Sequence, residues 1–224
     1  MQRHFDEQIQ EIRQKLVRMG GLAESMIASA LRMLIERDDR HFRDVSEREE
    51  QVNALQIEID DRCLKLLATQ TPLAVDLRLI TSAMKINSDL ERIGDQAVNI
   101  AENVVKILPH PSLKPLIDIP RMAEIAEKMT RDSLDSFVKR DPELARDVLR
   151  RDDSVDQLKD QVFRELLTYM MADPGTIQRA LCLILISRNL ERVADHATNI
   201  AEDVIFLVEA KDVRHHHLEE ENTR

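Results

Sequence analysis

The stretch DLERIGDQAVNIAEN, which begins at Asp89, returns one hundred residues later as NLERVADHATNIAED. The preceding sequence is repeated too. VSEREEQVNAL, which begins at Val45, matches VLRRDDSVDQL at an offset of 103, and TPLAVDLR corresponds to DPGTIQR. Matches in register over this length predict two copies of one structural unit. Any fold for this chain therefore has to be a duplicated one.

Within each copy, apolar residues recur at spacings of three and four, which is the pattern of amphipathic α-helices. The chain has only 4 Gly, no Trp and 3% aromatic residues, and this composition favours long helices. Short links make sequence neighbours antiparallel. We predict an all-α fold of two tandem three-helix bundles related by internal duplication. The predicted helices cover about 5–37, 42–68, 72–108, 121–139 and 142–171, and the last runs from near Pro174 to about 210.

The proline-rich segment PHPSLKPLIDIP is the predicted boundary between the copies, because four prolines in twelve residues exclude a helix interior. It divides the chain into a first repeat, residues 1–110, and a second repeat with a polar C-terminal tail, residues 111–224. At the start of the third helix, Thr71 is a predicted cap and Pro72 a predicted first-turn residue.

Small residues mark two further features of the predicted helices. MGGLAES is a predicted weak point in the first helix, since glycine is a poor helix former. Gly94 and its equivalent Ala194 leave space for a neighbouring helix to approach closely.

Charge and hydropathy exclude several classes of protein. A net charge of −10 argues against a nucleic-acid-binding protein and against a basic membrane-surface helix. The longest apolar run, ALCLILI, is much shorter than the roughly 20 residues of a membrane span, and MQRHFDEQIQ is no signal peptide. We expect a cytoplasmic protein in which Cys63 and Cys182, each within an apolar run, are buried free thiols.

A helical wheel of the repeated stretch separates its apolar residues from a strip of oxygen-bearing ones. Glu91, Asp95 and Asn99 follow one another at four-residue spacing, so their side chains line up. Like charges at this spacing weaken an isolated helix by about 0.2–0.5 kcal/mol, and the second copy repeats them, which suggests a function. With their neighbours, the two strips comprise Glu91, Asp95, Asn99 and Glu102, and Glu191, Asp195, Asn199 and Glu202.

The preceding helix of each copy adds further oxygen ligands. Asp152 and Asp156 lie four residues apart in the second copy, and Glu49 and Asn53 do so in the first. If adjacent helices bring these edges together, each bundle has a surface lined by carboxylates. Hard cations bind oxygen ligands, so the pattern indicates a metal site, with Fe, Mn, Mg, Zn or Ca as candidates and a multinuclear cluster as one form.

Two other interpretations remain open at this point. Acidic strips on helices commonly serve only as solvated faces, and a gene duplication that has not yet diverged would leave the same repetition.

A bundle-type metal store or metal-dependent oxidoreductase is the alternative function. It is disfavoured because the repeated stretch has no Glu-x-x-His, and His196 has only Gln96 opposite it. The tail histidines His215, His216 and His217 have no predicted fixed geometry, and we predict no enzymatic activity.

The motifs together resemble the PhoU family of phosphate-transport regulators. The resemblance rests on the two (D/N)LER(I/V)xD…NIAE helices, on DDSVDQL and TYMMADPGTI before the second of them, and on MGGLAESM and TPLAVDLRLI. It covers the chain from about Phe5 to His217. It implies two three-helix bundles and a cytoplasmic regulator that represses the phosphate-starvation response while phosphate is plentiful.

The resemblance also implies site residues, because some family members bind metal clusters through paired E/D-x-x-x-D motifs. One site would use Glu49, Asn53, Glu91 and Asp95, and the other Asp152, Asp156, Glu191 and Asp195. Two departures bear on their strength. Asn53 replaces an acid, which makes the first site one charge poorer, and Arg188 replaces Ser88 and is expected to neutralise part of the second.

The partners that the resemblance implies are the ATPase subunit of the phosphate ABC transporter and a membrane sensor histidine kinase. The protein would then act as an adaptor, peripheral to the membrane through these partners only. Wide apolar faces on the first and fourth helices leave room for a homodimer.

Overall fold

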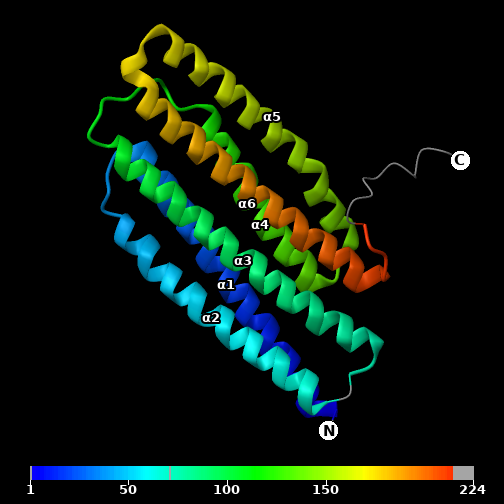
Figure 1. The fold of residues 1–224 in the computed structure, drawn as a ribbon. Coiled ribbons are helices and arrows are strands. Elements are labelled where there is room, and N and C mark those ends of the chain that lie inside the picture. Colours follow the sequence, from blue (N-terminus) through cyan, green and yellow to red (C-terminus); the bar gives the residue numbers. More distant parts are fainter. Residues whose placement is uncertain (1, 71, 214–224) are drawn as a thin grey trace, which may run out of the picture.

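The computed structural model describes residues 2–70 and 72–213, and these contain six α-helices and one short 3-10 helix (Figure 1). The all-α fold of two three-helix repeats is confirmed. The predicted cap Thr71 and the histidines 215–217 lie outside the described residues. The elements are α1 (Gln2–Glu36), α2 (Phe42–Thr69), α3 (Ala74–Ile107), α4 (Asp118–Lys139), α5 (Pro142–Ala172), η1 (Pro174–Thr176) and α6 (Ile177–Glu209).

The helices form two layers in which the repeats pack side by side (Figure 1). In one layer α3 and α6 lie next to each other at the centre, with α2 and α5 on the outer edges. In the other layer α1 packs on α2 and α3, α4 packs on α5 and α6, and α1 contacts α4. The helices that carry the two acidic strips are therefore the central pair of one layer.

A single apolar core runs through both repeats, so the two bundles fold onto each other rather than remaining separate. Polar side chains cross the α3–α6 contact as well. Lys85 Nζ lies 2.9 Å from Asp203 Oδ1, and the Ser82 hydroxyl donates to the Asp203 carbonyl at 3.4 Å. These contacts fix the antiparallel register of α3 against α6.

Two predicted helix starts were wrong, both at prolines. Pro72 precedes α3, which begins at Ala74 after an extended Leu73. Pro120 was assigned to the linker but lies in the first turn of α4, which begins at Asp118. A first-turn proline removes no helical hydrogen bond, because the N–H groups there have no intrahelical acceptor.

The predicted weak point in the first helix was also wrong, because α1 continues unbroken through Gly20 and Gly21. A Cβ atom on Gly20 would lie 1.9 Å from the Leu134 Cδ1 atom of α4, so this glycine permits a close approach of the two helices. The approach at Gly94 is looser. A Cβ there would meet Val52 Cγ1 at 3.5 Å, an ordinary contact that alanine could make.

The proline-rich linker between the repeats is held down by two arginines. Arg37 donates from Nη1 to the Ser112 hydroxyl at 3.1 Å and from Nη2 to the Leu108 carbonyl at 3.1 Å. Arg179 of α6 donates to the Pro111 carbonyl at 3.1 Å. The predicted boundary is therefore a well-anchored connection between the bundles.

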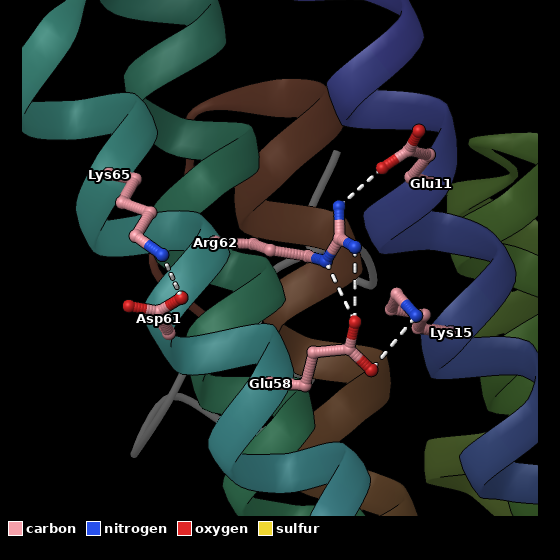
Figure 2. A network of polar contacts seen from close by, with 6 residues as sticks. All are labelled: Glu11, Lys15, Glu58, Asp61, Arg62 and Lys65. Carbon is pink, nitrogen blue, oxygen red and sulfur yellow. Dashed lines mark hydrogen bonds and ion pairs between the residues drawn. The ribbon is translucent and has the colours of Figure 1, made fainter.

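Ion pairs hold the outer edge of the first repeat, where α1 and α2 meet (Figure 2). Lys15 Nζ of α1 lies 2.9 Å from Glu58 Oε2 of α2, and Arg62 of α2 reaches both Glu58 and Glu11 of α1. Such exposed pairs contribute little each, so packing carries most of this contact.

Both cysteines are buried free thiols, as predicted. Burial, with a smaller effect of the Asp60 charge, raises the pKa of Cys63 to about 12. None of the helices in the described part of the chain is both long enough and apolar enough for a membrane span.

Two acidic faces as the candidate functional site

The first acidic face lies where α2 and α3 run side by side. Glu49 of α2 lies near Asp95 and Glu102 of α3. Burial is the largest cause of its raised pKa, and the charges of Asp95 and Glu102 raise this pKa further. Burial likewise raises the pKa of Glu91, followed by the charge of Asp95, while Arg92 and His196 oppose the shift. The predicted members of this face are Glu49, Asn53, Glu91, Asp95, Asn99 and Glu102.

The second acidic face lies between α5 and α6 and is more compact. Burial raises the pKa of Asp152 to about 6, and the charges of Asp195 and Asp156 add to the effect. The pKa of Asp195 is raised by partial desolvation and then by Glu191 and Asp156, although the residue retains contact with solvent. The predicted members of this face are Asp152, Asp156, Glu191, Asp195, Asn199 and Glu202.

A lysine that the sequence analysis missed bridges the second face. Lys159 Nζ lies 2.9 Å from Asp156 Oδ1 on its own helix and 3.3 Å from Glu191 Oε1 on α6. Its pKa is raised, chiefly by the hydrogen bond to Asp156 and despite some desolvation. Its position three residues after Asp156, on the same side of α5, is the signal that could have identified it.

Lys159 changes the expected balance between the two faces. Arg188, which was expected to neutralise the second face, is exposed on α6, and the ion pairs to Asp156 and Glu191 come from Lys159 instead. At the repeat offset, Asp156 and Lys159 correspond to Asn53 and Gln56. The second face has one more acid than the first but also one more base. The two faces therefore carry the same net negative charge.

A second missed cluster joins the two repeats between these faces. The Asp89 Oδ1 atom of α3 lies 2.9 Å from His196 Nδ1 of α6 and accepts a hydrogen bond from Asn199 Nδ2 at 3.2 Å. His196, whose counterpart in the first repeat is Gln96, therefore pairs with Asp89 of the other repeat. The amide of Asn199 is engaged in this contact between the repeats.

The donor set of both faces suits a hard cation, because carboxylate oxygens are the ligands that such ions prefer. Repulsion between carboxylates and desolvation already raise several of these pKa values, and the charge of a bound cation would offset both by stabilising the ionised carboxylates. In the described residues, however, no three His, Cys, Asp or Glu side chains are placed closely enough to hold a metal ion. Binding would therefore require side-chain rotation that draws the carboxylates together.

The family model of the PhoU domain matches this chain twice, at residues 16–104 and 119–204. The chain belongs to the PhoU family. The two matches fall one in each repeat and so fit the internal duplication.

Relatives within the PhoU family match over nearly the whole chain. A phosphate-specific transport system accessory protein PhoU homolog of Pseudomonas putida is 41% identical over 212 residues, which is 94% of this chain and 83% of the relative. The homolog of Aquifex aeolicus is 39% identical over 214 residues, covering 96% of this chain and 97% of the relative.

Crystal structures of two PhoU proteins have the same fold. PhoU from Pseudomonas aeruginosa superimposes with a TM-score of 0.90 at 38% identity, over 92% of this chain and all of that one (100%). The phosphate transport system regulatory protein PhoU from Streptococcus pneumoniae gives a TM-score of 0.85 at 27% identity, over 93% of this chain and 99% of that one.

Proposed function

We propose that this chain is an accessory regulator of phosphate-specific transport, acting as a cytoplasmic adaptor without catalytic activity. Its partners are the ATPase subunit of the phosphate ABC transporter and a sensor histidine kinase, and it restrains the phosphate-starvation response while phosphate is plentiful. The observation that carries the proposal is the match to phosphate-specific transport accessory proteins at about 40% identity over 94% of the chain.

The acidic faces give this adaptor its proposed cation dependence. The charge of Asp95 on α3 raises the pKa of Glu49 on α2, and the charge of Asp195 on α6 raises the pKa of Asp152 on α5, so carboxylates of adjacent helices lie close together in each repeat. A cation held between them would tie α2 to α3 or α5 to α6. The bound ion would thereby set the shape and charge of the surface that partners meet.

A metal store or a metal-dependent oxidoreductase fits the geometry less well. Glu191 keeps 21% and Asp156 keeps 50% of the side chain exposed, so the second face lies at the surface and not in a bundle core. Di-iron oxidases and stores instead place their ligands on the core side of facing helices.

The adaptor role is tested by binding of the purified full-length protein to the purified ATPase subunit and to the purified kinase. Each titration is run with Mn²⁺ and again with a chelator. We expect binding to at least one partner, with an affinity that changes between the two conditions. Binding to neither protein under either condition would contradict the proposal.

A further inference from the structure

The tip of the α5–α6 hairpin carries six large apolar side chains in contact with solvent. On α5, Phe163, Leu167 and Met171 repeat every four residues, and on α6, Ile177, Leu181 and Leu185 do the same. Their exposed fractions range from 42% to 79%. We call these six residues the apolar face.

The helix register places the two halves of the apolar face side by side. Lys159 of α5 pairs with Glu191 of α6, and the two helices are antiparallel. A residue four positions after Lys159 is therefore level with the residue four positions before Glu191, and so on along both helices. Leu167 is then level with the space between Leu181 and Leu185, and Met171 with that between Ile177 and Leu181. At this register the six positions lie along one seam between α5 and α6.

The same seam continues directly into the second acidic face. Phe163 follows Asp156 by seven residues, which is two helical turns or about 10 Å along the same side of α5. The stripe of Leu181 and Leu185 runs on along α6 through Arg188 to Asp195. Along residues 152–164 of α5 and 188–195 of α6, acids outnumber bases, which leaves negative charge in excess. The acids are Asp152, Asp153, Asp156, Asp160, Glu191 and Asp195, and the bases are Lys159, Arg164, Arg188 and Arg192.

The first repeat provides an internal comparison, because its equivalent positions are not apolar throughout. At the offsets of 103 for α2 and 100 for α3, Phe163, Leu181 and Leu185 correspond to Asp60, Thr81 and Lys85. Asp60 accepts a hydrogen bond from Asn87, and Lys85 pairs with Asp203. Leu64 and Leu77, the counterparts of Leu167 and Ile177, are exposed by 56% and 44%, so single exposed apolar residues occur in both repeats. Asp60, Thr81 and Lys85 interrupt them in the first repeat, so the bundle forms without a continuous apolar face there, and the complete face of the second repeat points to a role other than folding.

We propose that the apolar face and the adjoining second acidic face together dock an amphipathic helix of a partner protein, with an apolar stripe followed by basic residues. Large exposed apolar patches mark interaction sites, and a helix laid along a seam buries anchors at i, i+3 or i+4 and i+7. The excess of carboxylates at one end selects a basic end on the partner and sets its direction. This assignment rests on the adaptor function proposed above and names the surface that it uses.

The test compares two variants at equivalent positions of the two repeats. Leu167→Gln/Ile177→Gln removes half-exposed anchors from the apolar face, whereas Leu64→Gln/Leu77→Gln changes the matched first-repeat residues of similar exposure. The probe is a fluorescent amphipathic peptide with a leucine stripe and four C-terminal or N-terminal lysines. A second peptide has glutamates in place of the lysines. Binding is followed by fluorescence anisotropy in low and high salt.

We expect the basic peptide to bind wild type and the first-repeat variant equally, and the second-repeat variant about tenfold or more weakly. The acidic peptide should bind poorly to all three. Equal binding to all three proteins would overturn the docking site, and equal binding of both peptides would overturn its charge preference. Circular dichroism and unfolding curves show whether each variant is folded.

Two further measurements separate this proposal from others. Sedimentation of the second-repeat variant should give the same mass as wild type, and a change from dimer to monomer would assign the face to self-association instead. If wild type binds the ATPase or kinase and the second-repeat variant binds equally well, the adaptor function stands and the docking site fails. If wild type binds neither protein but the peptide pattern holds, the adaptor function fails and the docking site stands.

Discussion

At the scale of single residues, the second acidic face shows how one lysine alters a cluster of acids. Lys159 bonds Asp156 and Glu191, but Asp152 and Asp195 on the same face keep raised pKa values. The charge of Asp152 is thus desolvated and repelled in the folded protein. A cation would correct this, and in its absence the ionised carboxylate destabilises the fold.

The pH dependence of stability follows from Asp152. Its pKa is about 6 in the folded protein against an ordinary 3.8, so the folded state favours the protonated acid. The free energy of unfolding should therefore fall as the pH rises from about 4 to about 6, and change little with this group above that. This loss of unfolding free energy is complete once Asp152 is fully ionised, near neutral pH.

We predict that Asp152→Asn, in metal-free buffer with chelator, raises the free energy of unfolding at pH 7.5 by about 1–2 kcal/mol. The gain should shrink as the pH is lowered toward 4. Urea unfolding at both ends of this range measures it. Asp153→Asn, one residue further along and exposed, is the control and should change stability little. If Asp152→Asn raised the free energy of unfolding by the same amount at every pH, ionised Asp152 would not destabilise the folded protein.

At the scale of elements, the helices could be predicted from periodicity because each buries one apolar stripe, but helix ends and long-range contacts could not. Pro120 shows the first limit, since a proline inside the first turn looks like a linker residue in sequence. Gly20 shows the second, because its role depends on Leu134, a residue of α4 more than a hundred positions away.

Gly20 and Gly21 of α1 allow a test of the close approach between α1 and α4. Gly21 is exposed and a Cβ on it would meet nothing within 4 Å, so Gly21→Ala should stabilise the protein by about 0.5–1 kcal/mol through helix propensity. Gly20→Ala should lose that gain or destabilise, because the added Cβ would collide with Leu134. Urea midpoints of the two variants measure the difference. Equal stabilisation by both would mean that α1 and α4 are not held closely at Gly20.

The acidic faces could likewise be predicted only in part. The four-residue spacing of Glu91 and Asp95 placed them on one edge, and the packing of α2 on α3 and of α5 on α6 brings the partner acids to them. The Asp89–His196 pair was not foreseeable, because it depends on the register of α3 against α6. Within one helix the spacing determines which residues are neighbours, whereas between repeats only packing does.

At the scale of the whole molecule, the duplication places the two similar acidic strips on α3 and α6, which are the central helices of one layer (Figure 1). The apolar face, in contrast, is complete in the second repeat alone. The paired faces and the unpaired one imply different tasks. In our proposal, cation binding is a task of both repeats, whereas docking of a basic helix is a task of the second repeat alone. The proposed adaptor role would use this asymmetry, because two identical surfaces would present the same binding chemistry twice.

Calorimetric titration of metal-stripped protein with Mn²⁺ tests the central claim, that both acidic faces bind cations, most directly. Wild type should show two binding events, of which Asp95→Asn removes one, Asp195→Asn removes the other, and the double variant lacks both. Circular dichroism confirms that each variant keeps its helices. No binding by wild type, or two events that persist in the double variant, would contradict the account.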